Sequence, residues 1–114
     1  MYESILITIK KMIGAAADYD AFDTDLIIQI NSALMVVAQL GIGPAKGIKI
    51  TGEDETWDLL LTEEDNLEAV KTYIYILVRL AFDPPSSGSL LDNLEKQKQE
   101  YAWRLNVMAE TPAT

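Results

Sequence analysis

The chain has 114 residues and a formal net charge of −9, and it contains neither cysteine nor histidine. This length suits a single domain spanning 1–114, with a core of modest size. The acidic balance opposes attraction to nucleic-acid phosphates. The lack of cysteine excludes disulfides, and the lack of histidine removes the commonest general base and metal ligand. We therefore expect no catalytic, metal or cofactor site.

Two segments near the N-terminus repeat apolar residues at intervals of three and four, which predicts an amphipathic helix in each. The first helix is expected over 3–13, because Gly14 accepts the left-handed conformation that often ends a helix. The second is expected over 24–40, with Asp23 capping its free backbone amides. A polar link joins the two helices.

The second predicted helix is apolar on nearly all sides. Its core face contains Leu26, Ile30 and Leu34, whereas Ile28 and Met35 lie away from that face. A helix of this kind is buried on more than one side, so we expect it to be central in the bundle or to pack against a second chain.

Glycines and a proline interrupt the helical pattern over 41–56, and loops of this length are uncommon in small domains unless they have a function. Within this loop, 47–51 alternates apolar with polar residues, which fits a short strand or an extended arm. Ile48, Lys49 and Ile50 are interpreted as an assembly element, because an extended segment can add a strand to a neighbouring chain. The alternative is a surface loop whose isoleucines pack on their own core.

An acidic run covers 53–68 without a basic residue, which suggests either a cation site or a negatively charged rim. The spacing lacks the loop of alternating acids and a glycine that EF-hand calcium sites need, so no metal site is predicted. The ordinary alternative is a solvated loop followed by acids that favour a helix N-terminus. The candidate rim consists of Glu53, Asp54, Glu55 and Asp58.

Two further helices are predicted over 63–82 and 89–108 by the same apolar spacing. A sharp stop separates them, because proline lacks an amide proton and clashes with the preceding turn. This stop consists of Phe82, Asp83, Pro84 and Pro85. Residues 110–114 are expected to form a flexible tail. The predicted fold class is therefore all-α, a small four-helix bundle with a long loop or short hairpin between the second and third helices.

Three large aromatic side chains are candidate anchors, either of the core or of an interface. They are Trp57, Tyr75 and Trp103. Such side chains bury a large apolar area and can also reach a polar partner, so both roles fit their chemistry.

Six short segments follow one another along the chain in a recognisable order. They are 22–25 (FDTD), 30–32 (INS), 39–44 (QLGIGP), 67–73 (LEAVKTY), 79–85 (RLAFDPP) and 100–106 (EYAWRLN). In this order they resemble the small head–tail connector (adaptor) proteins of tailed bacteriophages and prophages. The resemblance covers nearly the whole chain, and its most specific parts are the Phe-Asp-Pro-Pro stop and the Trp-Arg-Leu-Asn near the end.

The resemblance implies a helical bundle that forms a ring beneath the portal, through which DNA passes. Its implied partners are further copies of this chain, the portal protein, downstream head-completion or tail proteins, and passing DNA without specific binding. It implies no cofactor and no membrane partner, and a place in the virion neck after assembly in the bacterial host cytoplasm.

A second function also fits the residues, namely a cytosolic helical module that binds one protein partner, such as a small regulator or chaperone. The two functions differ in symmetry, because a ring needs two different surfaces on each subunit. No apolar run reaches the roughly 18 residues of a membrane span, and no basic stretch precedes an apolar core near the N-terminus, so neither a span nor a signal peptide is expected.

Overall fold

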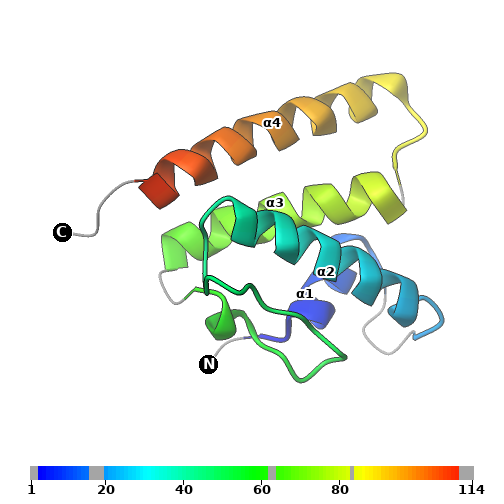
Figure 1. The fold of residues 1–114 in the computed structure, drawn as a ribbon. Coiled ribbons are helices and arrows are strands. Elements are labelled where there is room, and N and C mark those ends of the chain that lie inside the picture. The colour runs from blue at the N-terminus through cyan, green and yellow to red at the C-terminus, as the bar shows by residue number, and fades with distance from the viewer. Residues whose placement is uncertain (1–2, 16–19, 62–63, 83, 111–114) are drawn as a thin grey trace.

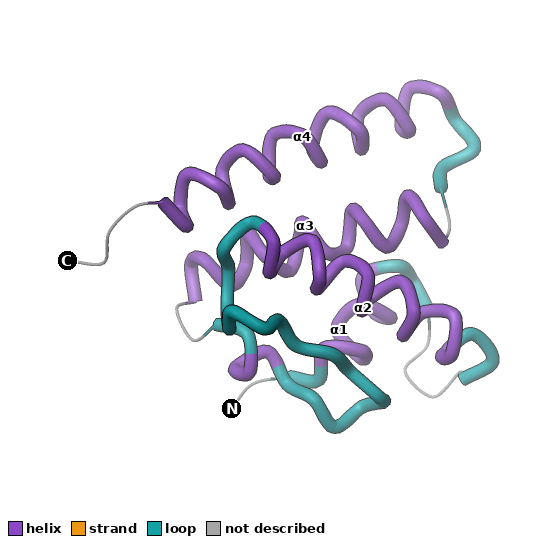
Figure 2. The backbone as a smooth tube through the Cα atoms, viewed as in Figure 1, coloured by secondary structure: helices purple, strands orange, loops and turns teal. Residues whose placement is uncertain are grey.

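The computed structural model describes residues 3–15, 20–61, 64–82 and 84–110. Within these residues the chain forms four α-helices and one short 3-10 helix, joined by loops (Figures 1 and 2). The helices are α1 (Ile5–Met12), α2 (Asp23–Gln39), η1 (Trp57–Leu59), α3 (Glu64–Phe82) and α4 (Gly88–Glu110). The described residues contain one isolated antiparallel bridge, between Ser4 and Thr56, and no strand. The predicted all-α bundle with a long loop after its second helix is confirmed.

The helix α3 is the centre of the bundle. Both α2 and α4 pack against it, and α1 packs on α2 and α3. Figure 1 shows α3 between α2 and α4, with α2 and α4 running in the same direction and α3 running in the opposite one. The outer sides of α2 and α4 are consequently different surfaces of one subunit.

Local signals explain where the first helices begin and end. The Ser4 hydroxyl oxygen accepts a hydrogen bond from the Ile7 amide at 3.3 Å and so caps α1. Gly41 follows α2 with φ of 93°, the left-handed conformation that favours glycine. The expected cap at Asp23 is wrong, because Asp23 is the first residue of α2 and the capping position belongs to Phe22. Asp23 instead forms an ion pair, described below.

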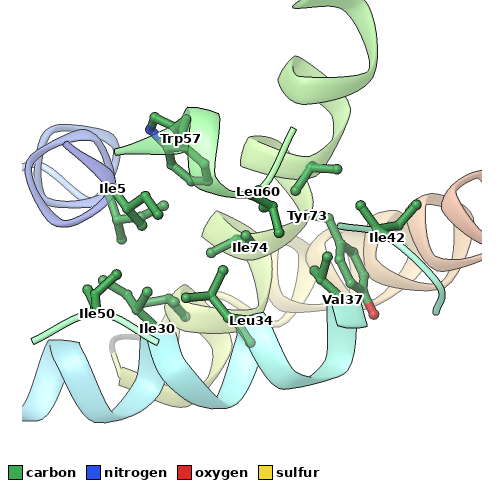
Figure 3. Packing of buried hydrophobic residues seen from close by; sticks show 14 of the residues in the cluster. Ile5, Ile30, Leu34, Val37, Ile42, Ile50, Trp57, Leu60, Tyr73 and Ile74 are labelled. Atoms are coloured by element: carbon green, nitrogen blue, oxygen red, sulfur yellow. The ribbon is translucent and has the colours of Figure 1, made fainter. Parts of the chain in front are cut away.

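One core joins all the helices and the long loop (Figure 3). The loop and η1 supply Ile42, Ile50, Trp57 and Leu60 to it, whereas the much longer α4 supplies one buried side chain, Leu105. The remaining buried apolar members are Ile5, Leu6, Ile9, Leu26, Ile30, Ala33, Leu34, Val37, Leu67, Val70, Tyr73, Ile74 and Val78.

Candidate functional site

The predicted assembly element of the long loop lies against its own subunit. Ile50 is buried, and its amide donates to the Asn31 side-chain oxygen at 2.7 Å while its carbonyl accepts from the Asn31 amide nitrogen at 3.0 Å. Ile48 is half-buried against the core, and Lys49 is exposed. The free backbone groups that strand addition requires are therefore not available at Ile50, because Asn31 of α2 already satisfies both of them.

A second set of contacts ties the end of the loop to the N-terminus. The Ile5 amide donates to the Glu55 carbonyl at 3.0 Å, and the Trp57 amide donates to the Glu3 carbonyl at 3.2 Å. The Trp57 side chain is fully buried, and its indole nitrogen donates to the Thr8 hydroxyl at 2.9 Å. Of its two candidate roles, Trp57 therefore has that of a core anchor.

The four acidic residues of the candidate rim divide into two groups. Glu53, Asp54 and Asp58 are exposed. Glu55 is half-buried, and its carboxylate accepts from the Thr51 amide at 3.0 Å and from the Thr51 hydroxyl at 2.9 Å. The Thr51 hydroxyl, helped by nearby backbone amides, holds the pKa of Glu55 below its ordinary value. Glu55 thus closes a turn of the loop, and the other three place charge on its surface.

No group of three or more potential metal-binding side chains comes together in the part of the chain that the structure describes. In the same part, no helix is long and apolar enough to cross a membrane. The described surface carries charged residues and several exposed apolar side chains.

A buried ion pair connects α1 to α2, and sequence reasoning missed it. The Lys10 side chain is 1% exposed, and its ammonium nitrogen lies 2.9 Å from a carboxylate oxygen of Asp23. One sequence signal could have indicated this burial, since Lys10 lies four residues after the buried Leu6 and so shares its helix face. Asn31, whose side chain binds both backbone groups of Ile50, had no comparable signal in the sequence.

The predicted helix stop ends α3 at Phe82, as expected, while Asp83 lies outside the described residues. The Phe82 ring meets the Phe22 ring edge-on, with centroids 5.7 Å apart. Pro84 is exposed and Pro85 is half-buried. A shallow hollow of about 180 Å³ lies where the chain turns from α3 into α4, lined by Arg79, Pro85, Leu90, Asn93, Leu94 and Gln97.

The two remaining aromatic anchors have different surroundings. Tyr75 is half-buried against the core, and its hydroxyl accepts a hydrogen bond from the Arg79 guanidinium at 2.9 Å. Trp103, in contrast, is 67% exposed on α4, although tryptophan is highly buried on average in folded proteins. Trp103 is therefore the interface candidate of the three.

A second exposed apolar surface lies on α2. Ile28 is 56% exposed and Met35 is 57% exposed, and they lie two turns apart on the side opposite Ile30 and Leu34, which are buried. The prediction that this helix has apolar residues beyond its core face is confirmed. With Trp103 on α4, each of the two helices that flank α3 carries large exposed apolar side chains.

Comparison with known proteins gives one finding. The model of a family described as phage connector protein matches residues 5–112, which covers all the helices and the long loop. No curated protein and no solved structure matches the chain. Because the matched range is most of the sequence and ends only in the residues after α4, the chain belongs to the phage connector protein family.

Proposed function

We propose that this chain is a structural subunit of the neck of a tailed phage or prophage particle, where copies of it form a ring beneath the portal. The observation that carries the proposal is the family match over residues 5–112, because phage connectors are structural components of the virion. In this role the chain joins the portal protein on one side to a head-completion or tail protein on the other, and assembles in the host cytoplasm.

The distribution of apolar surface supports a ring. A ring of identical subunits needs two different surfaces on each copy, which meet head to tail. The exposed side of α2, with Ile28 and Met35, and the exposed side of α4, with Trp103, are two such surfaces. A module that binds a single partner needs only one.

The surface charge supports passage of DNA without binding. The net charge is −9, and Glu53, Asp54 and Asp58 are exposed together near η1. We propose that these residues line the DNA path, where negative charge keeps phosphates from adhering. The chain then needs neither catalysis nor a cofactor, and the loop over 41–56 contributes to the ring by the surface it presents.

The test is the mass of the particle in solution, measured for the purified chain alone and again with purified portal protein. A ring subunit gives a closed assembly with a fixed number of copies, alone or on the portal. A complex of one copy with one partner, with no contact between copies, would support the interaction-module function instead. Binding of duplex DNA to the assembled ring at physiological salt would contradict the proposed lining.

A further inference from the structure

The helix α4 is attached to the rest of the subunit mainly along α3, and its two halves are attached differently. None of the residues over 88–100 is buried, and the shallow hollow at the corner opens beside this half. The contacts of α4 with the core lie in the other half. There Leu105 is buried, and the half-buried side chains that pack against the core are Tyr101, Ala102, Met108 and Ala109.

The rest of the core is formed without α4. All buried members of the core except Leu105 come from α1, α2, α3 and the segment over 41–60. The ion pairs of Glu95 with Lys98 and of Glu100 with Arg104 lie within α4, so they add nothing to its attachment. Separation of α4 from α3 thus breaks few buried apolar contacts, which is the condition under which part of a protein opens at a lower free energy than the whole.

One buried side chain of α3 lies beneath α4 and outside the core. Ile76 is 0% exposed, yet it is not a member of the core cluster that includes Ile74. Residues two apart are separated by about 200° around a helix axis, so Ile76 lies on the side of α3 opposite Ile74. Burial raises the pKa of Tyr73, one turn before Ile76, and the charge of Lys98 on α4 opposes this. The helix that covers Ile76 is therefore α4 (Figure 1).

We propose that α4 is an arm that opens from α3 as a unit, while α1, α2, α3 and the long loop stay folded. The hinge is the short connection over 84–87, in which Pro84, Ser86 and Ser87 are exposed. Opening uncovers Ile76 and leaves Ile74 buried. This conformational step goes beyond the proposed ring and does not depend on it. It lets α4 change its position in an assembled particle without unfolding of the rest of the subunit.

Cysteine labelling of the purified chain tests the opening, because the chain has no cysteine of its own. Ile76→Cys and Ile74→Cys are a matched pair, since both positions are 0% exposed and lie on the same helix. A thiol reagent such as dithionitrobenzoate reaches either sulfur only when the side chain is uncovered. We expect the Ile76→Cys variant to react more than about 100-fold faster than the Ile74→Cys variant, which should react only through its unfolded fraction. Urea denaturation of each variant gives that fraction.

Two further substitutions separate opening of α4 from unfolding of the whole chain. Asn31→Ala removes hydrogen bonds between α2 and the long loop that stay intact when α4 opens. It should accelerate labelling of the Ile74→Cys variant by about tenfold or more and change that of the Ile76→Cys variant by less than about twofold. Leu105→Ala removes the one buried side chain of α4, so it should accelerate labelling of the Ile76→Cys variant by about tenfold or more.

Three results would overturn the proposal. Equal labelling of the two single variants, after correction for their unfolded fractions, would show that only global unfolding uncovers Ile76. Acceleration by Asn31→Ala that is equal at both positions would show the same. Labelling of the Ile76→Cys variant that does not respond to Leu105→Ala would mean that a motion other than that of α4 uncovers this position. The comparison of the single variants is decisive even if a double variant does not fold, and none of these results bears on the ring.

Discussion

The segment over 41–60, which comprises the long loop and η1, differs from the helix α4 both in regular structure and in burial. The loop has little regular structure, yet Ile42, Ile50, Trp57 and Leu60 from it are all buried. The longest helix of the chain contributes a single buried side chain and leaves Trp103 on the surface. Irregular backbone therefore completes the core of this subunit, and the longest helix leaves a large aromatic side chain exposed.

The two tryptophans provide the strongest test of this contrast. Trp57→Ala removes a fully buried indole and its hydrogen bond to Thr8, and should lower the free energy of unfolding by about 4 kcal/mol. Trp103→Ala should change it by less than about 0.5 kcal/mol, because the side chain is exposed. Urea denaturation of the free subunit measures both. Similar losses for the two variants would show that α4 is as much a part of the core as the loop.

The ion pair between α1 and α2 should have the next largest effect. Asp23→Ala removes the carboxylate that lies 2.9 Å from the buried Lys10 ammonium and should destabilise the subunit by about 3 kcal/mol. The control is Asp25→Ala, which removes an exposed acid from the same first turn of α2. Thermal unfolding monitored by circular dichroism compares the two. An equal effect of both would assign the loss to the helix dipole and not to the ion pair.

Asn31 tests how firmly the loop is bound to α2. Asn31→Ala removes both hydrogen bonds to the backbone of Ile50 and leaves two buried polar groups unpaired, at an expected cost of about 2 kcal/mol. Hydrogen exchange at the Ile50 amide should become faster at the same time. The control is Asn93→Ala, at an exposed position of α4, which should change neither the stability of the subunit nor the exchange rate at Ile50. If the exchange at Ile50 is unchanged, the loop is held by its apolar contacts alone.

The corner between α3 and α4 should matter less. Replacing both Pro84 and Pro85 with alanine removes the fixed backbone that stops α3, and should lower stability by about 1 kcal/mol through the entropy of the unfolded chain. The double variant should also assemble less well, because α4 presents Trp103 at an angle that this corner helps to set. If the melting temperature and the assembly of the double variant are both unchanged, these prolines have no structural role.

The smallest effect at neutral pH concerns Tyr73, which packs in the core near Val37 and Ile42 (Figure 3). Burial raises the pKa of Tyr73 above its ordinary value of 10.0, and the charge of Lys98 opposes this only in part. The folded state therefore retains the proton longer than the unfolded state does. The stabilisation that the protonated Tyr73 hydroxyl gives the folded state is complete below pH 10. It is lost as pH rises toward the pKa of Tyr73 in the folded state.

The measurement is the free energy of unfolding between pH 8 and pH 11, a range set by the tyrosine reference value. The parent chain should lose stability at the alkaline end, and Tyr73→Phe should lose less. An identical decline in the two proteins would assign the alkaline loss to other groups.

Much of the fold could be predicted from the sequence, because apolar spacing and helix stops are local signals. The predicted helix over 63–82 corresponds to Glu64–Phe82, and the one over 24–40 corresponds to Asp23–Gln39. The place of Ile50 could not be predicted, since its burial depends on Asn31, which is distant along the chain. The alternation of Ile48, Lys49 and Ile50 fits an extended segment equally well whether it packs on its own core or on a neighbour.

The candidate site, like the fold, could be predicted from the sequence only in part. The sequence indicated extra apolar residues on the second helix and a tryptophan near the C-terminal end, but not which of the aromatic residues is exposed. That distinction depends on tertiary packing, because Trp57 is buried and donates a hydrogen bond to Thr8, whereas Trp103 is exposed.

We propose that copies of this chain meet in a ring through the exposed sides of α2 and α4. An electron cryomicroscopy reconstruction of the purified portal saturated with this chain tests it most directly. We expect a closed ring in which the exposed sides of α2 and α4 are buried at the contacts between copies. Isolated copies on the portal without mutual contact, or a ring whose copies meet through other faces, would contradict it.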